Sequence, residues 1–125
     1  MTFPDAMIAP TREAGSQTFD CILNSHSDCN AAICFNDYVA LGAYASIHAT
    51  GKVVGQTYSL VGFDSVPQSA SLLPPVTTVE LFLRDIGRKS AGLTLGRLKS
   101  PKRQYERLLI EPWLIARESV VKLRA

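Results

Sequence analysis

The sequence predicts an α/β protein, with a parallel sheet and flanking helices. Short apolar segments alternate with helix-like segments, and two of the apolar segments run into a polar residue. Residues 31–35 lead into Asn36, and residues 58–63 lead into Asp64. Residues 38–50, which lie between them, have a helical pattern. Such alternation is typical of parallel strands that are joined by right-handed crossovers.

The composition predicts one packed domain. The chain has 125 residues, of which 46% are hydrophobic and 19% are charged, so disorder is disfavoured. Residues 1–64 hold two basic and six acidic residues, a net charge of −4, whereas residues 65–125 hold eleven basic and five acidic residues, a net charge of +6. The basic half could bind phosphate or an acidic partner, but we favour a solvated helix face and tail.

The sequence shows no targeting or membrane signal. No apolar run reaches the roughly 18–20 residues that span a bilayer, and the first residues lack the basic and apolar regions of a signal peptide. The chain has three cysteines, an odd number that suits a reducing compartment and no disulfide framework. We therefore expect a cytoplasmic protein.

The first third of the chain predicts a helix before the first clear strand. Residues 6–9 are weakly strand-like. Thr11 is a plausible N-cap for a helix that ends near Asn24. The residues that this helix is expected to bury are Ala14, Thr18, Cys21 and Ile22.

The helix at residues 38–50, for which we expect Asp37 to be the cap, carries two apolar stripes instead of one. The stripes are Ala40, Ala43 and Ile47 on one side, and Leu41, Tyr44, Ala45 and His48 on the other. A surface helix normally has one apolar face. Two faces predict burial against the sheet and against something else, and Gly51 is a suitable C-terminal stop.

The second half predicts the remaining strands. Residues 58–63 resemble a buried parallel strand, and residues 65–75 form a loop with three prolines. A short β-branched strand at residues 76–79 precedes the longest helix pattern, at residues 80–98. Residues 105–110 and 113–116 are expected to be two closing strands, separated by Pro112.

Several motifs resemble those of LacI/GalR-type transcription regulators. Residues 35–43 (FNDYVALGA) resemble the element NDxxALGA, and residues 59–64 (SLVGFD) resemble SxVGFDD. Residues 73–79 (LPPVTTV) resemble PPLTTV, residues 111–119 (EPWLIARES) resemble PxLIxRES, and residues 11–15 (TREAG) resemble TxExG. The motifs occur in the family's order and spacing, so the signal is stronger than that of one short motif.

The resemblance implies a fold and a domain organisation. Family members join a helix-turn-helix to a two-lobed, periplasmic-binding-protein-like sensor, and a sugar or nucleobase binds between the lobes. This chain resembles only part of that sensor, namely the second lobe and the segment that crosses back to the first. We therefore expect residues 1–125 to be a partial sensor domain, without the helix-turn-helix and most of the first lobe, and unable to bind DNA by itself.

The resemblance also implies effector-binding residues. Asp64 is the first candidate, because a carboxylate accepts strong hydrogen bonds from hydroxyls or ring N–H groups; alternatively, it only forms a turn. Asn36 is the second, because an amide can donate and accept; alternatively, it caps the next helix, a role that Asp37 could take. Phe63 and Leu83 match apolar positions of the cleft, and core packing is equally compatible with both.

A dimer interface is the remaining expectation from the resemblance. In the family, the helix that matches residues 38–50 and the loop near residues 68–72 pair two copies. The second apolar stripe was inferred from periodicity alone and agrees with this. A deeper monomer core is the alternative. The expected interface residues are Leu41, Ala45, His48 and Leu72.

Other functions are less favoured by the residues. Cys21, His26, Cys29 and Cys34 do not have the spacing of a structural zinc site, and we expect no metal and no cofactor. The chain shows no catalytic triad, no nucleophile elbow and no phosphate loop, so an enzyme with a flavodoxin-like sheet is disfavoured. A transport-type sugar-binding protein, an inert fragment and a subunit that poisons full-length regulators remain alternatives.

Overall fold

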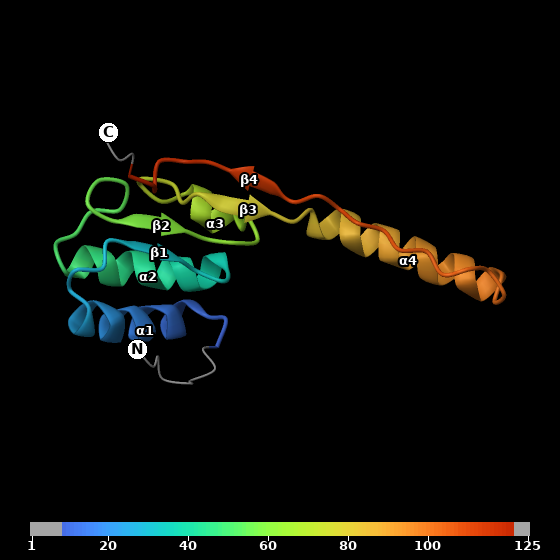
Figure 1. Ribbon diagram of the computed structural model, residues 1–125, viewed down its shortest axis with the longest axis horizontal. Helices are drawn as coiled ribbons and strands as arrows, with labels where there is room; N and C mark the ends of the chain where they lie inside the picture. The colour runs from blue at the N-terminus through green and yellow to red at the C-terminus, as the bar shows by residue number, and fades with distance from the viewer. Residues whose placement is uncertain (1–8, 122–125) are drawn as a thin grey trace.

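The parallel pairing of β1 and β2 organises the computed structural model, which describes residues 9–121 (Figure 1). β1 (Ala31–Ile33) runs parallel to β2 (Ser59–Val61), with Ile33 opposite Val61. β3 (Thr78–Glu80) belongs to a second two-stranded sheet, which is joined to the first by a parallel bridge between Val61 and Thr77 and by the Asp64 N–H, which donates to the Val79 carbonyl at 3.0 Å. β4 (Trp113–Ile115) pairs with β3 in the antiparallel direction. The α/β prediction with parallel strands is confirmed, with one antiparallel strand added.

α1 (Arg12–Ser25) begins where the sequence predicts, since the Thr11 hydroxyl accepts from the Ala14 N–H at 3.2 Å. Its predicted buried face is wrong by about one position. The buried residues are Gly15, Phe19 and Leu23, whereas Ala14, Thr18 and Ile22 are half-buried and Cys21 is exposed. The cause is a close helix contact, because a Cβ at Gly15 would lie 2.5 Å from the Val39 carbonyl oxygen. The strand predicted at residues 6–9 lies outside the described residues except for Ala9.

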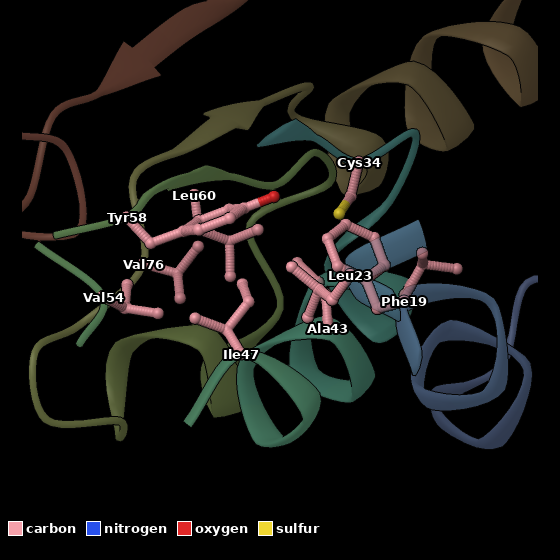
Figure 2. Close-up of a cluster of buried hydrophobic side chains, with 11 residues drawn as sticks. Phe19, Leu23, Cys34, Ala43, Ile47, Val54, Tyr58, Leu60 and Val76 are labelled. Atoms are coloured by element: carbon pink, nitrogen blue, oxygen red, sulfur yellow. The ribbon is translucent and has the colours of Figure 1, made fainter. Parts of the chain in front are cut away.

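α2 (Asp37–Ala49) packs against α1 and covers one face of the sheet (Figure 1). Ala43 and Ile47 of this helix are completely buried, and Figure 2 shows both among the core side chains. Tyr58 and Leu60 of the β2 region complete this core and are also completely buried. Burial of such side chains stabilises a fold by roughly 1.5–3 kcal/mol each. The core therefore lies between α2 and the sheet.

Among residues 9–121, no helix covers the opposite face of β1. Ile33 is 82% exposed and Phe35 is 55% exposed, while Cys34 between them is buried on the α2 side. The predicted strand at residues 31–35 ends at Ile33, so its last two residues were assigned wrongly. Parallel sheets are usually covered on both faces. This part of the chain therefore presents an open sheet surface.

β2, β3 and α4 begin one to three residues later than predicted, and the second half differs from the prediction in two further places. A short helix, α3 (Pro67–Ala70), lies within the loop predicted at residues 65–75. Residues 105–110 form no strand, so the prediction of a first closing strand is wrong. They run back beside α4 (Leu83–Lys99), away from the edge of any strand (Figure 1). Without a neighbouring strand, β-favouring residues cannot form a ladder.

We use the name arm for residues 82–112, which comprise α4 and the returning segment and project from the body (Figure 1). No residue of α4 is buried, although Leu83, Ile86, Leu95 and Leu98 are apolar. The end of the arm is held by the Arg97 guanidinium, which lies 3.9 Å from the centre of the Tyr105 ring. Within residues 9–121, no helix has both the length and the apolarity to cross a bilayer.

Candidate functional site

The carboxyl ends of β1 and β2 meet at one edge of the sheet. Beyond the two strands the backbone pairing continues, because the Cys34 N–H donates to the Val61 carbonyl at 2.8 Å and the Asp37 N–H donates to the Phe63 carbonyl at 2.7 Å. Asn36 and Asp64 flank this last bond in the sequence. The two residues therefore leave the sheet at the same edge, which is where open α/β sheets bind small ligands.

Asn36 is the N-cap of α2, which corrects the prediction that Asp37 has this role. The Asn36 Oδ1 accepts from the Val39 N–H at 2.8 Å, and the residue is only 8% exposed. The cap therefore uses the oxygen of the amide. The Nδ2 group has no partner among the described residues, so it can still donate to a ligand.

Asp64 is partly exposed and has an uncommon backbone conformation. Its φ angle is 97°, in the left-handed region that side chains rarely adopt. Burial raises the pKa of its carboxyl above the ordinary value, and the nearby Asp37 adds to this increase. A strained, partly desolvated carboxylate at a sheet edge is typical of a binding site more than of a simple turn.

The two predicted apolar residues have different places. Phe63 is half-buried and directly precedes Asp64, so it lies at the same edge. Leu83 is the first residue of α4 and is 56% exposed at the root of the arm. The structure therefore places Asn36, Phe63 and Asp64 at the same sheet edge. Leu83 does not lie at this edge, because it belongs to the arm.

The geometry of this edge suits a small polar ligand. One amide group can donate and one carboxylate can accept, and Phe63 adds an apolar surface beside them. The edge forms a single wall. A cavity of about 190 Å³ lies elsewhere, on the arm, where Leu93, Arg97 and Tyr105 are among its lining residues.

Asp37 is a residue of this region to which the sequence analysis assigned only a cap. Its side chain is completely buried. The Oδ2 atom accepts from the Val66 N–H at 2.8 Å, and the Oδ1 atom accepts from the Thr78 hydroxyl at 2.7 Å. No sequence signal marks this role; in the structure, Gly62 makes room for the carboxylate, since a Cβ there would lie 2.0 Å from Oδ1.

The motif at residues 111–119 also has a structural role that its sequence did not show. The Arg117 guanidinium donates to the Val76 carbonyl at 2.7 Å and to the Ser69 hydroxyl at 3.1 Å. The Ser119 hydroxyl donates to the Leu60 carbonyl at 2.5 Å and accepts from the Thr77 N–H at 2.8 Å. These contacts attach the end of the chain to β2 and β3.

The second apolar stripe of α2 lies on the outside of the body. Ala45 and His48 are exposed, and Leu41 is half-buried. The Tyr44 hydroxyl donates to the Leu73 carbonyl, so the stripe adjoins the loop after α3. Leu72 in that loop is half-buried against the core. The structure thus places all four predicted interface residues on α2 or beside it.

The cysteines and His26 do not converge. Cys21 is exposed on α1, and Cys34 is buried in the core. The Cys29 thiol lies 3.3 Å from the Tyr58 hydroxyl. In the part of the chain that the structure describes, no group of three or more His, Cys, Asp or Glu residues could hold a metal ion.

The family model for the periplasmic binding protein-like domain matches residues 2–120. The chain belongs to this family. Its similarity to LacI-type regulators is confirmed by the relatives, and so is the predicted periplasmic-binding-protein-like fold. The ribose operon repressor of Haemophilus influenzae is 30% identical over 112 residues, which are 90% of this chain and 34% of the repressor.

Solved structures of LacI-family proteins agree with the fold of this periplasmic binding protein-like domain. A LacI family transcriptional regulator from Enterococcus faecium with bound ribose has a TM-score of 0.83 and 25% identity, and the match covers 91% of this chain and 42% of that one. The lac repressor dimer bound to operator and an anti-inducer has a TM-score of 0.81 and 28% identity, over 90% and 39%. The chain thus spans about a third of the length of the curated relatives it matches.

Proposed function

We propose that this chain is the effector-sensing part of a LacI-type transcription regulator, and that it contributes one wall of the effector site. The observation that supports this most is the pairing of β1 with β2, which brings Asn36 and Asp64 to one sheet edge. The effector is a small polar molecule, either a sugar or a nucleobase, because the edge offers one amide donor and one carboxylate acceptor. Its role is binding, without catalysis.

The relatives favour a regulator over a transport protein. The Haemophilus influenzae relative is a ribose operon repressor, and the Enterococcus faecium regulator was solved with bound ribose. Ribose is therefore the first effector to test. In this proposal, closure of the first lobe over the edge changes DNA affinity, and DNA is bound by a domain outside the matched region.

Calorimetric titration of the 125-residue chain with ribose tests the proposed half-site. We expect a dissociation constant of about 1 mM or weaker, which corresponds to about −4 kcal/mol, because ligand pockets normally enclose most of their ligand. Micromolar binding would contradict a site with one wall. Heat of binding that is unchanged by Asp64→Asn would contradict the assigned edge.

We also propose that the outer face of α2 pairs two copies of the chain. Ala45 and His48 are exposed on an apolar stripe, and the solved lac repressor is a dimer. Leu41 and Leu72 would complete the surface. A fragment that retained this face without a DNA-binding domain could also pair with full-length regulators.

Sedimentation equilibrium of Ala45→Arg tests this dimer. The substitution should move the chain toward the monomer, because it places a charge in an apolar contact. Gln17→Arg, which adds the same charge at an exposed position of α1, should leave the mass unchanged. Both should be measured in a chain that carries Leu95→Glu and Leu98→Glu, so that the arm does not contribute. Equal masses for the two variants would contradict the interface.

A further inference from the structure

Asp37 is a completely buried carboxylate that connects three elements. It is the first residue of α2, and its N–H donates to the carbonyl of Phe63 after β2. Its side chain accepts from the N–H of Val66 before α3 and from the hydroxyl of Thr78 in β3. Neither ion pair found in residues 9–121 involves it. Burial of a carboxylate without a cationic partner is costly, so stability alone gives little reason for this residue.

The turn beside Asp37 contains two consecutive strained residues. Asp64 has a φ of 97° and Ser65 has a φ of 58°, both in the left-handed region. Residues other than glycine persist there only when their surroundings hold them. The turn follows β2 and carries the carboxylate of the proposed effector site.

Three successive amides hold this turn, and two of them depend on Asp37 or on its partner Thr78. The Asp64 N–H donates to the Val79 carbonyl at 3.0 Å. The Ser65 N–H donates to the Thr78 hydroxyl at 3.3 Å, and the Val66 N–H donates to the Asp37 Oδ2 at 2.8 Å. The Thr78 hydroxyl in turn donates to the Asp37 Oδ1 at 2.7 Å. Both amides thus depend on the Asp37 carboxylate: the Val66 N–H donates to it directly, and the Ser65 N–H is linked to it through the Thr78 hydroxyl.

We propose that Asp37 is a positioning residue of the effector site: its carboxylate, together with Thr78, clamps residues 64–66 and so holds Asp64 at the sheet edge. This inference rests on the proposed function in one respect, namely that this sheet edge is an effector site. The clamp itself follows from the hydrogen bonds and from Gly62, which leaves room for Oδ1 against bare backbone.

Amide hydrogen exchange in the 125-residue chain tests the clamp with a matched pair of variants. Thr78→Val removes the hydroxyl that holds Ser65 and Asp37. Thr77→Val makes the same change one residue earlier, at a buried hydroxyl that bonds only to the Arg117 backbone. We expect Ser65 to exchange at least about tenfold faster in Thr78→Val than in Thr77→Val, after correction for global stability, because its N–H loses its acceptor. Val66 should also exchange faster, because its acceptor Asp37 loses the hydrogen bond that holds Oδ1.

Two substitutions of Asp37 distinguish the effect of its hydrogen bonds from the effect of its negative charge. Asp37→Ala should speed exchange at Val66. Asp37→Asn should restore slow exchange, because the amide oxygen can accept from Val66 while the Nδ2 group donates to Thr78. Asp37→Asn should also lower the pKa of Asp64, measured by carbon-13 NMR of its carboxyl, because a like charge is removed. A residue that acted only on global stability would not speed exchange at Val66 beyond the global change, nor would Asp37→Asn restore it.

Two results would overturn the inference. One is equal exchange of Ser65 and Val66 in Thr78→Val and Thr77→Val, and the other is equal exchange of Val66 in Asp37→Ala and Asp37→Asn. If a variant of Asp37 fails to fold, the comparison of the two threonine variants still decides. Because no effector is present in these measurements, failure of ribose to bind would contradict the proposed function and leave the clamp standing.

Discussion

Gly62 shows how closely the residues around the sheet edge are packed. A Cβ at this position would lie 2.0 Å from the Asp37 Oδ1 and 3.4 Å from the Ala40 Cβ. Such contacts cannot be relieved by a small rotation, because Asp37 is fixed by two hydrogen bonds. The glycine is needed here for close approach of a side chain to the backbone, whereas no unusual φ is involved.

Gly62→Ala should therefore lower the free energy of unfolding by about 3 kcal/mol, through overpacking and loss of the Asp37 hydrogen bonds. Urea unfolding followed by circular dichroism measures this loss. Gly87→Ala is the matched control, since a Cβ there would meet nothing within 4 Å, and it should cause no loss. A loss of less than about 0.5 kcal/mol for Gly62→Ala, within the range of ordinary surface substitutions, would contradict the close contact.

Asp64 should destabilise the fold at neutral pH, as functional groups often do. Its pKa is raised in the folded state, first by burial and then by Asp37. The unfolded chain therefore loses this proton at lower pH than the folded chain, and the cost is fully present above the raised pKa. Asp64→Asn should unfold at a higher urea concentration than the wild type at pH 7, and the gain should vanish as the pH falls toward the ordinary carboxyl value. A variant less stable than the wild type at pH 7 would contradict this.

The sequence predicts part of this edge and misses the rest, for physical reasons. Asn36 and Asp64 could be placed together because residues that follow parallel neighbouring strands leave the sheet at one edge. The role of Asp37 could not be predicted, because its partner Thr78 lies 41 residues away along the chain. Local sequence offered it only the role of a cap, which the adjacent Asn36 takes.

At the scale of elements, α2 is the most constrained part of the fold. One side of the helix packs on the sheet and on α1, the outer side carries the proposed interface, and its first turn lies at the proposed site. The Asn36 Oδ1 caps the helix, and in the proposed site the Nδ2 group of the same amide contacts the ligand. These roles can be separated by substitution.

Asn36→Ala should cost about 1 kcal/mol of stability because the cap is lost, whereas Asn36→Ser should stay within about 0.5 kcal/mol of the wild type, since serine caps as well as asparagine. Thermal unfolding measures the difference. Both variants lack the amide donor and should weaken ribose binding equally. Retained binding in Asn36→Ser would show that Nδ2 makes no ligand contact.

The elements that depend on local pattern were predicted well, and those that depend on distant partners were not. The cap and start of α1, the helical span of α2 and the parallel β2 follow from short-range signals. The strand predicted at residues 105–110 failed, because that segment lies beside α4 and not beside a strand. The buried face of α1 differs from the predicted face for a similar reason. Gly15 packs closely against Val39 of α2, and hydrophobic periodicity does not predict such a contact between two helices.

At the scale of the whole molecule, two apolar surfaces are uncovered within residues 9–121. The arm exposes apolar side chains along α4, and Ile33 in β1 and Phe35 just after it are exposed on the open face. Exposed apolar patches of this kind promote association between molecules.

We expect the chain with Ala45→Arg to self-associate through the arm, with an apparent mass that rises with concentration in light scattering. Adding Leu95→Glu and Leu98→Glu should abolish the increase, because both side chains are more than half exposed on α4. Thr94→Glu, a charge on an exposed polar position of the same helix, is the control and should leave it unchanged. A constant monomer mass before the leucine substitutions would contradict the prediction.

The central claim is that Asn36 and Asp64 form one wall of an effector site, and titration of the nitrogen-15-labelled chain with ribose tests it most directly. We predict weak binding, with chemical-shift changes concentrated at residues 36–37 and 62–66 and absent in Asp64→Asn. Shift changes that lie instead on α1 or the arm, or none at that edge under saturating ribose and nucleobase, would contradict the account.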